Sequence, residues 1–547
     1  MSTKAALLTL FLATPALAAP TRMLVFLGTS DQHGHIEQVP LLARYFEDER
    51  QRNPGRVLLL DGGDMFQGTL VSNLHEGAAM IHALNAVRYD AVAVGNHEFD
   101  YGPVGPHEAP KSPDEDARGA LEARESEAKF PFLSANVFDA KTGKTFAKPW
   151  VILDVDHVKV GIVGGTAEDT PRTTNPRNLV GLRVGPLGPA VAKAAKDARA
   201  AGATVVIAVV HAGGNCSQFA VVTEAAPADN AQSCEQDADS FRLARYLHDA
   251  AAHGEGGRVD GIFGGHTHQG VNNVVAGIPI LQAYDIGRAF SKLELEVDGS
   301  GRPTGHFVAH PPEPVKKDTT PVAAVSAAIA GDLAEAAGLR AAAIGVTLPA
   351  PLKRAYKAES PLGNFAADII REASATEVGL TNGGGLRADL PAGELTYGAI
   401  FESFPFDNRL ATMTLTAAEL SDLFRRNFAH DKGILSVSGI RVRAHCDGGA
   451  LAIELTRDDG KVIAPSTPLK IGTSDFLANG GDDFAPTVAN RHPLFLESEP
   501  LRDIIAAALK DRLKKGEREL VVAPWFDAAK PRILLPMPKP VVCKAAS

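Results

Sequence analysis

Ala91-Val92-Ala93-Val94-Gly95-Asn96-His97-Glu98-Phe99-Asp100 is the stretch that decides the fold of this 547-residue chain. Its four apolar residues predict a short buried strand, and the glycine then lets the backbone turn sharply into a polar segment. Similar apolar runs occur at Met23–Leu27, Val57–Leu60, Val160–Val163, Val205–Val210 and Gly261–Phe263. Alanine-rich stretches with helical spacing, such as Leu187–Ala201, lie between several of them. Strands that alternate with helices predict an α/β domain with layered sheets.

Potential metal ligands follow five of these predicted strands. They lie in Asp31-Gln32-His33-Gly34-His35, Gly62-Gly63-Asp64, Gly95–Asp100, His211-Ala212-Gly213-Gly214 and Gly264-Gly265-His266-Thr267-His268. Taken singly, each motif is commonly a turn, a helix cap or surface decoration. Together they favour one site, because ligand chemistry in such sheets gathers at the carboxyl ends of strands. Mixed imidazole and carboxylate side chains suit divalent transition metals.

The order of these motifs resembles that of the calcineurin-like metallophosphoesterases. The strings Gly95–Asp100 and Lys129–Asn136 narrow the resemblance to the 5′-nucleotidase family. It implies an N-terminal four-layer α/β-β-α sandwich, a helical linker and a C-terminal α/β nucleotide-binding domain. It also implies that Asp31, His33 and His268 bind one divalent metal ion, that Asn96, His211 and His266 bind a second, and that Asp64 bridges both. We expect manganese, zinc or cobalt.

Physical chemistry gives such a pair of metals a definite task. Two ions ~3.5–4 Å apart can share a hydroxide, lower its pKa and hold a phosphate oxygen in line for attack. The resemblance makes His97 a hydrogen-bond donor to the phosphoryl oxygen or the leaving group, with Asp100 fixing its orientation. The alternative is that His97 only supports the metal ligands.

The C-terminal half holds four further strings that resemble the nucleotide-binding domain of the same family. They are Glu359–Asn364, Asn382–Arg387, Phe404–Asn408 and Asp475–Asp482. The substrate contacts that the resemblance implies are Asn382, Arg387, Phe406, Asn408, Phe476 and Asp482. Phe406 and Phe476 would stack on the two faces of the nucleobase, whereas the alternative is a role for both in the core.

One position departs from the family pattern. Relatives carry a further arginine seven residues before the glycine that corresponds to Gly363, and this chain has Tyr356 there. Lys353, Arg354 and Lys357 lie close by in the sequence. One of these three can take the place of the missing cation, or the substrate carries less charge.

The domain boundaries follow from composition and from the resemblance. We expect a signal peptide at 1–18, the dimetal domain at 19–312, a linker helix at 313–343, the nucleotide-binding domain at 344–535 and a tail at 536–547. Within this scheme Pro311–Pro314 predicts a stiff connector and Pro321–Ala343 a helical stretch. The polar segment Tyr101–Lys129 predicts a surface loop or insertion.

The first residues have the order typical of a secretory signal. Lys4 precedes the apolar run Ala5–Ala13, and Ala16-Leu17-Ala18 fits a cleavage site, so we expect a periplasmic or secreted protein cut near Ala18. The apolar run is too short to span a bilayer, and we expect no stable membrane insertion. The net charge of −10 argues against binding of nucleic acid and leaves a small nucleotide as the expected partner.

The four cysteines suit an oxidising compartment. We expect Cys216 to pair with Cys234, and Cys446 with Cys543, with free buried thiols as the alternative.

These expectations describe an exported phosphomonoesterase that hydrolyses nucleoside 5′-phosphates to nucleoside and phosphate by attack of a metal-bound hydroxide. With metals in one domain and the base slot in the other, a hinge near the linker must bring substrate to the metals. Two alternatives are the related thiosulfohydrolase of bacterial sulfur oxidation and a nucleotide-binding protein without catalysis.

Overall fold

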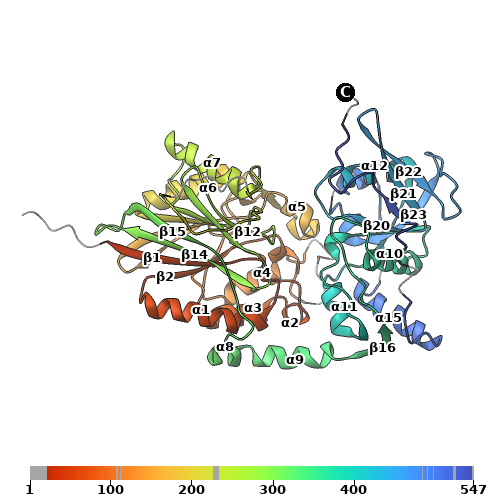
Figure 1. Cartoon of the computed structure of the whole chain (residues 1–547), viewed down its shortest axis with the longest axis horizontal. Coiled ribbons are helices and arrows are strands. Elements are labelled where there is room, and N and C mark those ends of the chain that lie inside the picture. The colour runs from red at the N-terminus through yellow and green to blue at the C-terminus, as the bar shows by residue number, and fades with distance from the viewer. Residues whose placement is uncertain are drawn as a thin grey trace, which may run out of the picture.

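The computed structural model describes residues 21–544, apart from 106–108, 111, 113, 226–232, 483, 490, 497 and 522–524. The predicted signal peptide, residues 1–18, lies outside the described residues. The described chain forms two α/β bodies that two consecutive helices connect along one side (Figure 1).

Two sheets form the centre of the N-terminal body. The strands of the first sheet run, in spatial order, β10 (Val222–Thr223), β15 (Pro303–Pro314), β14 (Ala289–Val297), β1 (Arg22–Thr29), β2 (Val57–Asp61), β3 (Ala91–Ala93) and β4 (Phe132–Leu133). Those of the second run β12 (Gly270–Val275), β13 (Ile278–Ala283), β11 (Gly261–Phe263), β9 (Val205–Val210), β7 (Val158–Gly165) and β6 (Trp150–Val155). All six apolar runs of the sequence are therefore strands, as predicted.

The side chains of β1 show why the sheets stack. Leu24 and Phe26 belong to a core cluster that also holds residues of β7 and β9, so this cluster fills the space between the sheets. Val25 and Leu27 point to the other face, where they meet helical residues. Helices α1 (Val39–Arg52) and α3 (Ala78–Val87) cover that outer face, while α6 (Leu187–Ala200) and α7 (Asp239–Ala252) cover the second sheet. The predicted four-layer α/β-β-α sandwich is confirmed.

Strand direction brings the motif loops together. β1, β2, β3 and β4 are mutually parallel, as are β7, β9 and β11. Parallel strands end at the same edge of their sheet, so the residues that follow them share one rim.

The predicted connector at Pro311–Pro314 is wrong, because these residues continue strand β15. Its partner β14 pairs Phe290 with Glu313 and Lys292 with His310, and the register shifts between the two pairs. Pro311 and Pro312 thus fall in a bulge, where a missing backbone N–H breaks no ladder hydrogen bond.

The segment Tyr101–Lys129, predicted as a surface loop, contains helix α4 (Gly119–Glu127). Ala120, Leu121 and Arg124 on this helix are buried. Four of its nine residues are charged, and a helix with one narrow apolar face is difficult to distinguish from a polar loop by sequence.

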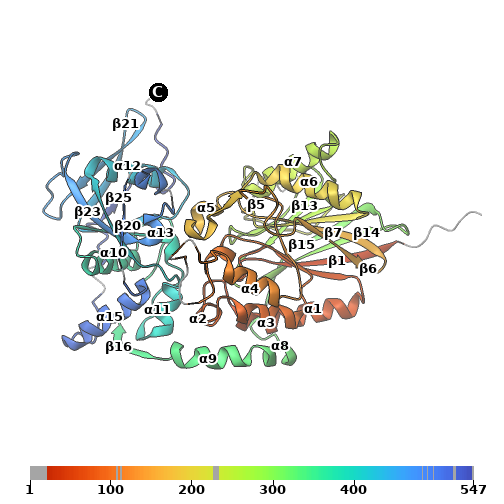
Figure 2. The same ribbon diagram turned by 180° about the vertical axis from the view of Figure 1, so that it is seen from behind.

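Helices α8 (Ala323–Ala328) and α9 (Ala330–Arg340) form the connection and lead into strand β16 (Ala343–Leu348). The main C-terminal sheet has the strand order β20 (Leu435–Ser438), β17 (Val378–Asn382), β23 (Pro468–Ser474), β19 (Leu410–Thr416) and β24 (Leu494–Phe495). Figure 2 shows helices on both sides of it. They are α10 (Pro361–Ala373), α11 (Tyr397–Ser403) and α15 (Leu501–Lys514) in one core, and α12 (Ala417–Ala429) in the other.

The shorter elements complete both bodies. In the first they are α2 (Leu70–Asn73), α5 (Thr170–Thr173), β5 (Val137–Asp139) and β8 (Leu182–Val184). In the second they are α13 (Asp475–Ala478), α14 (Ala485–Val488), β18 (Gly393–Thr396), β21 (Arg441–Asp447), β22 (Ala450–Thr456) and β25 (Ile533–Leu534).

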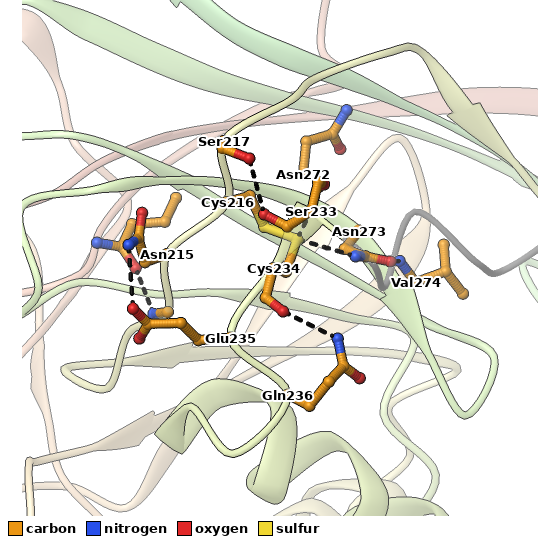
Figure 3. Close-up of a disulfide and its surroundings, with 12 residues drawn as sticks. Asn215, Cys216, Ser217, Ser233, Cys234, Glu235, Gln236, Asn272, Asn273 and Val274 are labelled. Carbon is orange, nitrogen blue, oxygen red and sulfur yellow. Dashed lines mark hydrogen bonds between the residues drawn. A yellow bond between two sulfur atoms is a disulfide. The ribbon is translucent and has the colours of Figure 1, made fainter. Parts of the chain in front are cut away.

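Both predicted disulfides are present. Cys216–Cys234 staples a polar loop beside β12, where the Asn273 amide donates to the Cys234 sulfur at 3.1 Å (Figure 3). Cys446–Cys543 ties strand β21 to the C-terminal tail.

The two disulfides differ in the length of chain that they close, with sequence separations of 18 and 97. We expect replacement of Cys446 and Cys543 by serine to lower the free energy of unfolding of the C-terminal body by about 2–4 kcal/mol, because a longer closed loop constrains the unfolded chain more. Denaturant unfolding in a Trp150→Phe background measures this through Trp525, which is 4% exposed. The paired serine variant of Cys216 and Cys234 is the control and leaves that transition in place. An unchanged Trp525 midpoint in the Cys446 and Cys543 variant would contradict the expectation.

Candidate active site

The loops after β1, β2, β3, β9 and β11 meet at one rim of the sandwich. They carry all seven expected metal ligands: Asp31, His33, Asp64, Asn96, His211, His266 and His268. Five of the seven are buried, and His266 and His268 are partly exposed. In each of three overlapping groups of His and Asp side chains, the ligand atoms lie within 4.8 Å of one another. The structure therefore brings the expected ligands together.

The backbone of these loops is strained in the same way at several ligands. Positive φ angles occur at Asp31 (52°), His33 (47°), Asp64 (57°), His266 (79°) and His268 (57°). Residues with a Cβ rarely adopt this left-handed region, and such strain concentrates at functional sites. Because the positive φ angles are concentrated at the expected ligands, we infer that this strained backbone is what directs the ligand side chains toward one another.

The first ligand group contains Asp31, His33 and His268. Nε2 of His33 lies 3.0 Å from Nε2 of His268, which lies 3.6 Å from the Asp31 carboxylate. Nδ1 of His33 faces the Gln67 carbonyl at 3.1 Å, and Nδ1 of His268 faces Asp285 at 3.2 Å. With both Nδ1 atoms donating to these partners, both Nε2 atoms present lone pairs to one point.

The second group contains Asp64, Asn96, His211 and His266. Nε2 of His211 lies 3.1 Å from the Asp64 carboxylate, 3.0 Å from the Asn96 side-chain oxygen and 3.1 Å from Nδ1 of His266. Nδ1 of His211 donates to the Gly62 carbonyl at 2.8 Å, and Nε2 of His266 lies 3.1 Å from Asp169. Four acceptor atoms again converge.

Asp64 lies between the two groups. The same carboxylate oxygen is 3.1 Å from Nε2 of His211 and 4.0 Å from Nε2 of His33. Burial acts to raise the pKa of the Asp64 carboxyl, but the imidazoles of His211 and His97 outweigh it and hold the pKa well below its usual range.

The donor set fits divalent metal ions. Imidazole nitrogens and carboxylate oxygens whose lone pairs point at one another repel unless a cation lies between them. Asp31 Oδ2 is buried without a hydrogen-bond partner, although a buried carboxylate oxygen normally has one. An ion between Asp31, His33 and His268 would satisfy it.

His97 stands beside the ligands with its own partner. Its Nδ1 lies 2.5 Å from the Asp100 carboxylate, which also accepts from the Thr174 hydroxyl at 2.7 Å. Burial acts to lower the pKa of His97, but the Asp100 and Asp64 carboxylates more than offset it, and the pKa is raised overall. The ring of His97 lies 5.2 Å from that of His33 and 5.9 Å from that of Phe406, between centroids.

The C-terminal body reaches this rim through Arg387 and Phe406. Nη2 of Arg387 lies 3.2 Å from Nε2 of His33, and its guanidinium lies 6.0 Å from the centre of the Phe406 ring. Asn382, Phe406 and Asn408 line one small hollow.

Asp482 and Phe476 belong to the segment that follows Ser474, another residue that lines the hollow. Asp482 accepts from the Asn382 amide at 2.5 Å. Phe476 is partly buried and packs with its ring against Gly481 and a hydrophobic core.

Comparison with known proteins matches both bodies. Residues 24–270 match the calcineurin-like phosphoesterase family, and residues 340–490 match the 5′-nucleotidase C-terminal domain. The chain belongs to the 5′-nucleotidase family of metallophosphoesterases. It is a metal-dependent hydrolase of the 5′-nucleotidase type.

Two curated relatives and two solved structures illustrate the relationship. Protein UshA of Salmonella pullorum is 25% identical, over 89% of this chain and 91% of its own. A snake venom 5′-nucleotidase from Naja atra is 26% identical, over 84% and 91%. The 5′-nucleotidase precursor of Thermus thermophilus has a TM-score of 0.72 at 22% identity, over 94% of this chain and 99% of its own. The sulfate thiohydrolase SoxB of that organism has a TM-score of 0.68 at 15% identity, over 95% and 98%, which shows the shared fold alone.

Tyr356, where the family resemblance predicts an arginine, lies beside the Gly383–Gly385 turn that follows Asn382. The ring of Tyr356 lies near Gly384 and Gly433. Of the neighbouring cations, Lys357 pairs with Asp431, while Arg354 donates to the carbonyl of Leu386, directly before Arg387. Arg354 is therefore the cation that the structure brings beside Arg387.

Sequence reasoning assigned no role to Glu98, although it lies within the motif at Gly95–Asp100. Its carboxylate accepts from the backbone N–H groups of Gly95 at 2.6 Å, Asp64 at 2.9 Å and Met65 at 2.8 Å. Glu98 thus locks the loops after β2 and β3 to each other.

Asp169 and Asp285, which contact His266 and His268, were also missed. Both follow strands, β7 and β13, at the rim where ligands collect, and that position was the available signal.

Among the described residues, no helix combines the length and the apolar character needed to cross a membrane. The two disulfides fit an exported protein.

The donor set predicts two divalent metal ions per chain. We expect His268→Ala to weaken binding of one ion by at least about tenfold, because it removes a direct ligand from one group only. Elemental analysis after equilibrium dialysis against manganese or zinc measures the stoichiometry. His35→Ala is the matched control, since His35 lies in the β1 loop and pairs with Glu37. Two ions bound with unchanged affinity in His268→Ala would show that this group is not a metal site.

Proposed function

We propose that this protein is an exported, two-metal phosphomonoesterase that hydrolyses nucleoside 5′-phosphates to nucleoside and phosphate. The observation that carries the proposal is the meeting of Arg387 and Phe406 with His33 and His97. A cation and an aromatic ring from one domain stand at the ligand cluster of the other. A substrate with an anionic phosphate and a flat base matches that pairing.

The proposed ligand assignment follows the two groups. Asp31, His33 and His268 would hold one ion, Asn96, His211 and His266 the other, and Asp64 would bridge them. Bound there, two divalent ions supply an activated water nucleophile and stabilise the charge that develops on the phosphoryl group. Manganese, zinc or cobalt fits the nitrogen and oxygen donors.

We assign His97 the role of hydrogen-bond donor to the reacting phosphate. Because Nδ1 is held by Asp100, Nε2 is the atom free to point into the site, and it lies 4.0 Å from Asp64. The raised pKa keeps this imidazole in its donating form over a wider pH range. A donor held in place before reaction stabilises negative charge on the phosphoryl or leaving oxygen without rearrangement.

Arg387 would bind the phosphate, and Asn382, Phe406 and Asn408, which line the hollow, would contact the nucleoside. Asp482, bonded to Asn382, adds an acceptor for ribose or base. Phe406 lines the hollow and would stack on one face of the base, and Phe476, whose ring packs against Gly481, would stack on the other.

Export rests on three observations. The first residues have the order of a secretory signal, the cysteines form two disulfides, and one relative is named as a venom enzyme. We therefore propose that the reaction takes place outside the cytoplasm, in the periplasm or the medium.

Phosphate release tests the reaction. Metal-stripped protein supplied again with manganese, zinc or cobalt should release phosphate from nucleoside 5′-monophosphates. His97→Ala should lower kcat about 10²–10⁴-fold, as loss of a positioned proton donor does, and Asp64→Ala should abolish turnover. His35→Ala should remain active.

Two other outcomes of this experiment would each support one of the alternative functions. Metal-loaded protein that releases no phosphate from any nucleotide, and instead releases sulfate from a sulfur-carrier protein, would replace the proposal with the thiosulfohydrolase activity. Nucleotide binding without turnover would replace it with a binding role.

The base site has its own test. We expect Phe406→Ala to raise KM for a nucleoside 5′-monophosphate about tenfold, since stacking on a base contributes ~1–3 kcal/mol. KM for p-nitrophenyl phosphate, which has no base, should stay within about twofold of the parent. Phe495→Ala, a 44% exposed phenylalanine on β24, is the control. Equal losses on both substrates would rule out a base-stacking role.

A further inference from the structure

A single carboxylate beside the second ligand group is bound from both domains. Asp169 Oδ2 accepts from the amine of Lys432 at 2.5 Å, while its Oδ1 lies 3.1 Å from Nε2 of His266. The side chains of Lys432 and Asp169 are 25% and 19% exposed. A partly buried ion pair of this kind is strong only while both partners stay in place.

The segment after Asp169 contacts both an expected metal ligand and the C-terminal domain. Helix α5 begins at Thr170, and the Thr173 carbonyl accepts from the Asn96 amide at 3.4 Å. On the other side, the backbone N–H of Asp482 donates to the Arg172 carbonyl at 3.2 Å. In Figures 1 and 2, α5 lies on the flank of the first domain that faces the second. Residues 169–173 thus lie between two expected metal ligands and the nucleotide-binding domain.

Lys432 lies two and three residues before residues that are hydrogen-bonded or paired to the strand carrying Asn382 of the hollow. It is in the loop between α12 and β20, where the Ile434 carbonyl accepts from the Gly383 N–H at 2.8 Å and Leu435 pairs with Asn382. The Gly433 carbonyl accepts from the Asn427 amide at 2.8 Å and from the buried Lys539 amine at 3.4 Å. The position of Lys432 therefore follows the position of the hollow relative to the metal cluster.

We propose that Lys432 is the latch of the closed enzyme, a positioning residue that binds Asp169 when the domains meet and thereby fixes the segment supporting His266 and Asn96. This inference rests on the proposed function, because it couples nucleotide capture to the second metal group. On separation of the domains, Asp169 keeps His266 and loses Lys432. Substrates that span both domains depend on the latch, whereas small phosphate esters do not.

The kinetic test compares two substrates on metal-loaded protein. Lys432→Met should lower kcat for adenosine 5′-monophosphate about tenfold, a loss within the range of interaction energies measured for residues in contact. The same variant should leave kcat for p-nitrophenyl phosphate within about twofold of the parent value. Lys432→Arg should restore at least half of the loss, because it keeps the charge. Lys461→Met is the control, since Lys461 is 83% exposed and pairs within its own turn with Asp459. Equal losses on both substrates, or no loss on the nucleotide, would overturn the latch.

A second measurement does not depend on turnover. Small-angle X-ray scattering of metal-stripped protein with adenosine 5′-monophosphate should give a larger radius of gyration for Lys432→Met than for the parent. Asp169→Asn should expand the protein similarly, and Lys432→Met should add little in the Asp169→Asn background. Identical scattering of parent and Lys432→Met would overturn the proposal. A parent that does not hydrolyse nucleotides refutes the proposed function, while the scattering comparison still decides on the latch.

Discussion

The site depends most on the hydrogen bonds that the Glu98 carboxylate accepts from the backbone. This carboxylate gathers three backbone N–H groups from the loops after β2 and β3, so Asp64 and Asn96 keep a fixed separation. The loops need this support, because several ligands hold positive φ angles that cost free energy. Gly95 completes the arrangement, since a Cβ there would lie 2.2 Å from the Asp64 carboxylate. The metal geometry is thus set by backbone constraints before any ion binds.

The same principle extends across the domain boundary. Asp169 and His33 each touch a ligand group and a cation of the other domain, through Lys432 and Arg387. The two domains therefore contact each other at the expected metal ligands. The hollow lined by Asn382 and Phe406 lies next to His97, whose ring is near that of Phe406. For a site divided in this way, we expect domain motion to admit substrate and closure to exclude water.

The sequence predicted the strands, the sandwich and the segments that carry the site, because buried apolar runs and motif order are local signals. It could not predict the bulge that places Pro311 and Pro312 inside β15, since that depends on the register with β14. It also missed Asp169 and Lys432, which lie far apart in the chain and meet only through the folding of both domains. The place of Phe476 against Gly481 depends on a turn at Gly480 that side-chain patterns do not reveal.

The net charge of −10 does not conflict with an anionic substrate. Exposed charges farther away than the Debye length, about 10 Å at 0.1 M salt, are largely screened. What a phosphate meets at the site is local. Arg387 lies beside His33, and Arg354 donates to the carbonyl directly before Arg387. Burial, together with the charge of Arg354, lowers the pKa of Arg387, the effect expected of cations held close together. An anion between them would relieve that repulsion, so we expect Arg354 to supply the second positive charge at this site, although position 356 is a tyrosine.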